Sequence, residues 1–170
     1  ALSFLSVRGR KATASIDLPG DLVRSHLHTT PERMQDYWRM SALGGVMSGS
    51  IGVRGHYANG LAALYLATGQ DAACVAESAV GGTRIEHREG DRLFVSVTLP
   101  NIIVGTVGGG TGLPTQSAGL NILGLKGEGK ARALAEVAAS LCLAGELSII
   151  GALCAHEFAS AHKKLARDGR

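Results

Sequence analysis

Several kinds of residue are scarce in this sequence of 170 residues. Aromatic residues make up only 4% and charged residues 18%, whereas 45% of the chain is hydrophobic. This balance predicts one folded domain with a sizeable core and excludes a mainly disordered chain. The net charge is only +3, and no basic cluster is longer than the one from Arg8 to Lys11. The sequence therefore gives no support for a nucleic-acid-binding protein that works by neutralising phosphates.

Cysteine is also rare, and no targeting segment is evident. Cys74, Cys142 and Cys154 lie in apolar sequence, and their odd number predicts reduced thiols in the core rather than a disulfide framework. Reduced thiols indicate a reducing compartment, most simply the cytoplasm. The residues before Arg8 are too few for the apolar stretch of a signal peptide. Since the chain does not begin with Met, we expect it to be a piece of a longer protein.

Local signals predict a strand and a helix in the first part of the chain. Residues 11–18 alternate between small or apolar and polar side chains, the period of a half-buried strand, and Pro19-Gly20 ends it. Thr30-Pro31-Glu32 offers a cap, a proline at the first helical position and an early acid. A helix is therefore predicted from about 31 to the mid-40s.

A second helix is predicted over residues 56–68, where leucines recur at helical spacing. Gly69 is a typical stop at the C-terminal end, so Gln70 and Asp71 fall in the turn that follows.

The next part of the chain changes to a strand-like pattern. Three short runs, separated by turns that contain glycine, predict a β-meander and hence an antiparallel sheet. The runs lie near 73–80, 83–88 and 92–99. A glycine-rich run over 105–112 and a short helix from Pro114 to about Gly124 follow.

The last element is a long helix predicted from Lys130 to about Arg167, a stretch without proline. Its part from 137 to 155 is apolar or small except at Glu146, a pattern typical of a helix that is buried all round. A membrane span is the alternative, but an acid at mid-bilayer costs roughly 2.5–3.5 kcal/mol. Burying Glu146 without a partner would also be costly, so we expect a hydrogen-bonded contact for it. The elements together predict an α+β fold in which an antiparallel sheet and shorter helices wrap a long buried central helix, with no membrane segment.

Asp71 and His162 are the first candidates for chemistry. Asp71 stands among small residues just after a helix end, where the commoner role of an Asp is a local hydrogen-bond acceptor. His162 lies where the apolar helix gives way to basic residues, and a solvated histidine at a helix end is the alternative. His56 and His156 fit packing roles equally well. The histidines show no spacing typical of metal ligands, so no metal site is predicted.

The glycine-rich run, Gly105-Thr-Val-Gly-Gly-Gly-Thr-Gly112, is a further candidate because it lies between a predicted strand and a predicted helix. Successive backbone N–H groups in such a run can form a concavity that binds an anion, and a tight turn is the alternative. The run lacks the Lys-Ser/Thr ending of a Walker motif and a GxGxxG-plus-acid arrangement, so it does not indicate a general nucleotide-binding site.

Several motifs, taken in order and spacing, resemble 3-hydroxy-3-methylglutaryl-CoA (HMG-CoA) reductase over nearly the whole chain. They are Gly69-Gln-Asp-Ala-Ala73, Gly105-Thr-Val-Gly-Gly-Gly-Thr111, Ala144-Gly-Glu-Leu-Ser148 and His162 on the terminal helix. His56-Tyr-Ala-Asn59 and Arg8-Gly-Arg10 also resemble stretches of that family. The chain is similar to the C-terminal part of the large, HMG-CoA-binding domain of a class I-like enzyme, bacterial or archaeal in type.

The resemblance implies an NADPH-dependent, four-electron reduction of HMG-CoA to mevalonate and CoA in isoprenoid precursor synthesis. Asp71 matches the catalytic Asp that lies between a catalytic Glu and Lys, and His162 matches the general acid that protonates the departing CoA thiolate. Substrate contacts are implied at Arg10, His56, Asn59 and Ile149. The second dinucleotide-binding motif of the family falls on Gly108, Gly109, Gly110 and Thr111.

Other parts of the family pattern are missing from these residues. The segment with the catalytic Glu (ENVIG), the cofactor motif DAMGMN and the loop with the catalytic Lys would lie upstream, and none is present. The small NADP-binding domain is therefore absent, and we expect this chain to be inactive alone and to need the upstream half of the enzyme.

The resemblance also implies a homo-oligomer with shared active sites, of unspecified size. Three points stay open: whether the cofactor is NADPH or NADH, whether mevalonate is made or degraded, and whether the chain is truncated or naturally split. The alternative function is a non-catalytic CoA-binding or dimerisation fragment of the same fold.

Overall fold

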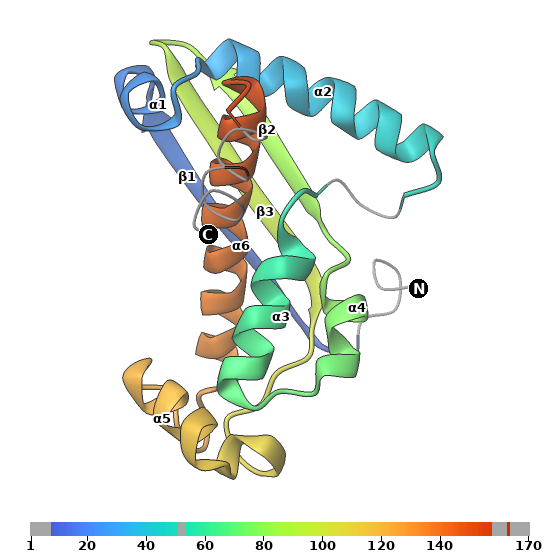
Figure 1. The fold of residues 1–170 in the computed structure, drawn as a ribbon, viewed down its shortest axis with the longest axis vertical. Helices are drawn as coiled ribbons and strands as arrows, with labels where there is room; N and C mark the ends of the chain where they lie inside the picture. The colour runs from blue at the N-terminus through green and yellow to red at the C-terminus, as the bar shows by residue number, and fades with distance from the viewer. Residues whose placement is uncertain (1–7, 51–53, 158–162, 164–170) are drawn as a thin grey trace.

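The centre of the structure, a computed structural model that describes residues 8–50, 54–157 and 163, is a three-stranded antiparallel sheet (Figure 1). The strands are β1 (Arg10–Pro19), β2 (Gly82–Arg88) and β3 (Arg92–Ile102). β3 is the middle strand, since it forms a hairpin with β2 on one edge and pairs with β1 on the other. The strands predicted at 11–18, 83–88 and 92–99 are confirmed.

One face of β3 carries much of the core. Leu93, Val95, Val97 and Leu99 are fully buried and alternate with partly exposed residues. Because side chains alternate across a strand, this period of two directs one face of the sheet toward the helices.

Helix α6 (Ala131–Cys154) lies along the sheet and packs against β1 and β3 (Figure 1). Its buried side chains include Leu134, Ala138, Cys142 and Ile150. The predicted α+β fold with a long central helix is therefore confirmed.

The prediction that α6 is buried on every face is wrong for the described part of the chain. Exposed side chains recur at every fourth position of the helix: Arg132, Glu136, Ser140, Ala144 and Ser148. The sheet and the neighbouring helices cover the other sides and leave this face open. α6 is long and apolar enough to cross a membrane by length and composition, a test that core helices of soluble proteins also pass.

The remaining helices surround α6 and follow the predicted start and stop signals. The bounds are Gly20–Leu27 for α1, Pro31–Met47 for α2, Tyr57–Thr68 for α3 and Pro114–Ile122 for α5. At the start of α2 the Thr30 side chain accepts a hydrogen bond from the backbone N–H of Arg33 at 3.3 Å. α3 ends at Gly69 in the left-handed conformation (φ 70°). The short helix α1 was not predicted, and it starts after Pro19 without a side-chain cap.

The strand predicted near 73–80 is wrong, because this segment forms the short helices η1 (Ala72–Cys74) and α4 (Val75–Ser78). Asp71 Oδ1 accepts a hydrogen bond from the backbone N–H of Ala73 at 3.0 Å, which starts the helical turn. At its other end Ser78 Oγ accepts from the Tyr65 hydroxyl at 2.7 Å and from the backbone N–H of Ile103 at 3.1 Å. These bonds outweigh the local preference of valine for a strand.

All three cysteines are free and buried, as the sequence predicts. Burial, with a smaller contribution from the nearby Glu146 carboxylate, raises the pKa of the Cys142 thiol to about 12. We expect Cys142 to resist thiol reagents at pH 8 in the native protein, because the thiolate is the reactive form. Mass spectrometry after timed alkylation would locate the modified thiols, with urea-unfolded protein as the reference. Modification of native Cys142 as fast as in urea would contradict this packing.

Candidate functional site

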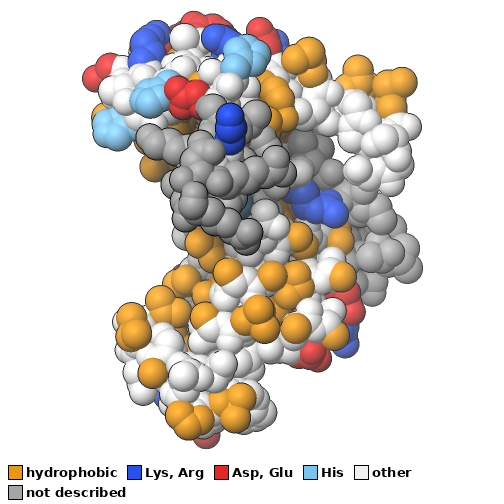
Figure 2. All heavy atoms as spheres, in the orientation of Figure 1, with side chains coloured by type: hydrophobic (Ala, Val, Ile, Leu, Met, Phe, Trp, Pro, Cys, Tyr) orange, Lys and Arg blue, Asp and Glu red, His pale blue; other side chains and the backbone are white. Residues whose placement is uncertain are grey.

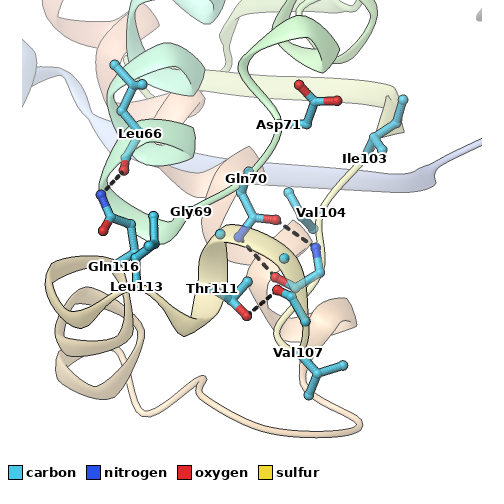
Figure 3. Close-up of a pocket in the computed structure, with 14 residues that line it drawn as sticks. Leu66, Gly69, Gln70, Asp71, Ile103, Val104, Val107, Thr111, Leu113 and Gln116 are labelled. Atoms are coloured by element: carbon cyan, nitrogen blue, oxygen red, sulfur yellow. Dashed lines mark hydrogen bonds between the residues drawn. The ribbon is translucent and has the colours of Figure 1, made fainter.

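A hollow of about 540 Å³ lies where the turn after α3 meets the glycine-rich run (Figure 3). It brings together the segments that start at Gly69 and at Gly105, which lie far apart in the sequence. Asp71 and all four residues of the predicted cofactor motif line it. The lining residues are Leu66, Gly69, Gln70, Asp71, Ile103, Val104, Gly105, Val107, Gly108, Gly109, Gly110, Thr111, Leu113 and Gln116.

The Gln70 side chain ties the two segments together (Figure 3). Its Nε2 donates to the carbonyl oxygens of Thr68 and Gly105, both at 2.9 Å, and its Oε1 accepts from the backbone N–H of Gly105 at 2.7 Å. The side-chain amide thus satisfies both backbone groups of Gly105, as a neighbouring strand would. This fixes the exit of β3 against the end of α3.

Gly69 and Gly110 touch through their backbones, which requires glycine at both positions. A Cβ on Gly69 would lie 2.3 Å from the Gly110 carbonyl oxygen, and a Cβ on Gly110 would lie 2.7 Å from the Gly69 carbonyl oxygen. Gly108 and Gly109 have positive φ angles (75° and 51°). Among the described residues, apart from each glycine and its two chain neighbours, no atom lies within 4 Å of where their Cβ atoms would stand. One side of the glycine-rich run therefore contacts the end of α3, and the other side presents backbone without side chains.

Asp71 is exposed, and its Oδ1 accepts from the backbone N–H of Ala73. The local acceptor role is therefore present, as one of the two predicted interpretations. The Cys74 thiol donates a hydrogen bond to Oδ2 at 3.8 Å. Both carboxylate oxygens of Asp71 therefore have a local donor, and the exposed residue lines the hollow.

His56, Asn59 and Ile149 lie at the other end of α3. His56 precedes the first residue of the helix, and Asn59 is exposed in its first turn. Ile149 Cγ2 would lie 3.1 Å from a Cβ on Gly55, so α6 touches the same loop. Because α3 has 12 residues, about 18 Å of helix separates this group from Asp71.

Arg10 and His162 complete the predicted site residues. The exposed Arg10 donates from Nη1 to the carbonyl oxygen of Val104 at 3.0 Å, next to the hollow. His162 lies outside the described residues.

Glu146 has the hydrogen-bonded contacts that its burial requires. With only 1% of its surface exposed, its Oε1 accepts from the backbone N–H groups of Gly55 and His56 at 2.6 and 2.5 Å. Its Oε2 accepts from the Thr83 hydroxyl at 2.8 Å, and Thr83 Oγ1 lies 2.8 Å from the Tyr57 hydroxyl. Burial raises the pKa of Tyr57, so its hydroxyl stays protonated. Sequence reasoning missed Thr83 and Tyr57, although the single charge in an apolar helix signalled that partners exist.

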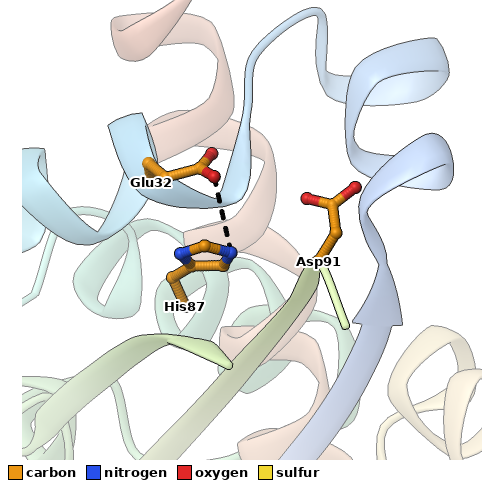
Figure 4. Close-up of side chains that lie close together, drawn as sticks. All are labelled: Glu32, His87 and Asp91. Carbon is orange, nitrogen blue, oxygen red and sulfur yellow. Dashed lines mark ion pairs between the residues drawn. The ribbon is translucent and has the colours of Figure 1, made fainter. Parts of the chain in front are cut away.

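A second group of titratable side chains lies at the β2–β3 hairpin, at the other end of β3 from the hollow (Figure 4). One ligand atom each of Glu32, His87 and Asp91 lies within 4.8 Å of the others, and Glu32 Oε1 is 3.4 Å from His87 Nε2. Asp91 is already paired with Arg24 at 2.7 and 3.0 Å, chiefly through hydrogen bonds that lower the pKa of Asp91. The positions of these three residues in the sequence did not predict the group, because they come from separate elements that only the fold brings together. It could hold a cation only after Arg24 released Asp91.

Comparisons with known proteins place the chain in a family of oxidoreductases. The family model described as hydroxymethylglutaryl-coenzyme A reductase matches residues 1–167, so the chain belongs to the HMG-CoA reductase family. The 3-hydroxy-3-methylglutaryl-coenzyme A reductase of Methanothermobacter thermautotrophicus is 45% identical over 168 residues, which cover 98% of this chain and 42% of that protein.

Further relatives give the same result. The reductase of Haloferax volcanii is 46% identical over 173 residues, covering 98% of this chain and 43% of that protein. Reductase 2 of Gossypium hirsutum is 39% identical over 179 residues, covering 100% of this chain and 28% of that protein. The chain therefore spans less than half the length of these relatives, and the resemblance read from its motifs is confirmed at the level of the family.

Two matched glycine variants test the contact between Gly69 and Gly110. Gly110→Ala places a methyl group against the Gly69 carbonyl and should destabilise the protein by about 1–3 kcal/mol. Gly112→Ala, in the same run, meets no atom within 4 Å and should change the stability by less than about 0.5 kcal/mol. Urea unfolding followed by circular dichroism measures both. Equal losses in the two variants would contradict the contact.

Proposed function

We propose that this chain is the part of an HMG-CoA reductase that binds the thioester and contributes Asp71 and His162 to catalysis. The reaction is the four-electron reduction of HMG-CoA to mevalonate and free CoA, with two molecules of NADPH. The main support for the proposal is that Asp71 and the glycine-rich run line the same hollow.

The glycine-rich run fits a dinucleotide because no side chain stands between its backbone and the hollow. Without a Cβ, Gly108 and Gly109 allow a ligand to approach the main chain closely. Lys126 donates a hydrogen bond from Nζ to the carbonyl oxygen of Thr111, which brings a positive charge near the site of an anionic cofactor. The bound nicotinamide cofactor would supply the hydride. NADH stays an alternative, since residues that distinguish a 2′-phosphate would lie in the small NADP-binding domain, whose motifs are not among these 170 residues.

Asp71 and His162 would take part in proton transfer in this proposal. Asp71 accepts hydrogen bonds from the Ala73 N–H and from the Cys74 thiol, and these bonds hold its carboxylate where it lines the hollow. A catalytic Glu and Lys supplied by the upstream part would then lie on either side of it, and Asp71 would tune their protonation. His162 would protonate the departing thiolate, a role suited to a group that titrates near neutrality.

His56, Asn59 and Ile149 would contact HMG-CoA, and Arg10 would lie near its CoA phosphates. Because about 18 Å of helix separates His56 from Asp71, their side chains cannot meet at one reacting carbon within a single copy. A homo-oligomer with active sites shared between copies resolves this, because the His56 end of one copy can face the Asp71 end of another.

Exposed apolar surface supports the same assembly. Figure 2 shows hydrophobic side chains gathered over the end of α2 and over the region of α3 and α5. Met40, Leu43 and Met47 on α2 are 69%, 64% and 79% exposed. Partner copies, or the remaining part of each chain, would cover this surface, and we propose the cytoplasm as the compartment.

The test is thioester-dependent oxidation of NADPH, followed at 340 nm, by the full product of the reading frame that contains these residues. We expect turnover by the unaltered protein and a loss of about 100-fold or more in Asp71→Asn, because general acid–base groups contribute at least this much. Binding of HMG-CoA should be retained.

Asp36→Asn is the matched control, since Asp36 is an exposed acid paired with Arg39 on α2. It should leave turnover unchanged. Unaltered turnover in Asp71→Asn would defeat the assignment of Asp71. Absence of turnover in the unaltered protein, with CoA binding intact, would favour the non-catalytic alternative.

A further inference from the structure

We infer that Gly145 and Glu146, adjacent on α6, form a seat that fixes His56 for contact with the thioester. Both are positioning residues, since they act through His56 and do not themselves touch substrate in this proposal. The inference rests on the proposed function only for what His56 contacts. The seat itself follows from the geometry of the described residues.

Gly145 makes room for the imidazole of His56. A Cβ on Gly145 would lie 1.9 Å from His56 Nδ1 and 2.4 Å from Cγ, so the ring rests on the bare backbone of α6. On the other side, a Cβ on Gly60 would lie 3.0 Å from His56 Cε1. The ring is therefore held between α3 and α6 by two glycines, and no other residue type at 145 permits this position.

Glu146 holds the backbone that carries this ring. One carboxylate oxygen accepts from the N–H groups of both Gly55 and His56. These groups immediately precede α3, so the carboxylate also lies at the positive end of the helix dipole. Hydrogen bonds to a charged acceptor are about twice as strong as neutral ones. The buried charge thus restricts the backbone on which the orientation of His56 depends.

The hydroxyl groups of Thr83 and Tyr57 orient the Glu146 carboxylate. Thr83 on β2 donates to Glu146 Oε2. Tyr57 must therefore donate to Thr83 Oγ1, which lies 2.8 Å from its hydroxyl, because each hydroxyl has one proton. Both side chains are buried, at 1% and 3% exposure. Residues from α3, α6 and β2 thus converge to fix one carboxylate.

The seat also determines which tautomer of the His56 ring is favoured. Its Nδ1 is buried and has no hydrogen-bond partner among the described residues. Burying an unpaired N–H is rarer than burying an unpaired lone pair, so the favoured tautomer carries its proton on Nε2. His56 is thereby prepared to donate one hydrogen bond from Nε2 to an oxygen of the thioester.

The experiment compares Glu146→Gln and Gly145→Ala with the unaltered full-length protein. Gln keeps the size of Glu but removes the charge, and Ala displaces the His56 ring. We expect each variant to raise the KM for HMG-CoA about tenfold or more and to leave the KM for the nicotinamide cofactor unchanged. A merely structural role would lower the fraction of folded enzyme and leave both KM values as they were, which would overturn the inference.

Two controls match these variants. Glu136→Gln changes an exposed acid on the same helix, and Gly44→Ala changes a helical glycine with no atom within 4 Å of its Cβ position. Neither should change the KM for HMG-CoA, and a change as large as in the seat variants would contradict the inference.

Hydrogen exchange separates the seat from the proposed function. If the unaltered protein shows no thioester-dependent turnover, the proposed function fails, but the seat still predicts faster exchange of the His56 amide in Glu146→Gln. An unchanged rate of exchange would overturn the seat as well. In the unaltered protein, the ¹⁵N shifts of His56 should show the Nε2–H tautomer.

Discussion

The backbone contact between Gly69 and Gly110 is the constraint on which the candidate site depends. It brings the turn that carries Asp71 against a loop from another part of the chain, and any side chain larger than hydrogen would separate them. Gln70 then fixes the spacing with hydrogen bonds to both backbone groups of Gly105. The result is a hollow that is lined by an acid and by backbone without side chains, and the proposed function rests on this arrangement.

α3 connects this hollow to the second half of the site. At one end it stops at Gly69, and at the other it begins at the backbone that Glu146 holds. The start of α3 is thus held by a tertiary contact from α6, and its end combines the local cap at Gly69 with the contact to Gly110. In the proposed homo-oligomer, the length of α3 means that His56 and Asp71 of one copy would serve different active sites. The exposed faces of α2 and α6 are consistent with further protein surface covering this chain, which spans 42% of its Methanothermobacter relative.

Much of the fold could be predicted from the sequence, because the signals were local. The period of two in 11–18 and 92–99, the cap at Thr30 and the stop at Gly69 each act within a few residues. The error at 73–80 arose because Ser78 takes its hydrogen bonds from Tyr65 and from Ile103, a residue distant in the sequence. The open face of α6 was missed for a similar reason, since composition does not reveal how many neighbours a helix has. Motifs predicted Asp71 and the glycine run, whereas the partners of Glu146 lie about 60 and 90 residues away and leave no pattern of spacing.

The decisive measurement is a crystal structure of the full-length protein with a CoA thioester and NADP⁺ bound. We expect the Asp71 carboxylate to lie between the catalytic Glu and Lys beside the thioester carbonyl, and the dinucleotide to lie against the main chain of Gly108 and Gly109. A thioester bound away from Asp71, or a dinucleotide that leaves the glycine-rich run bare, would contradict this expectation.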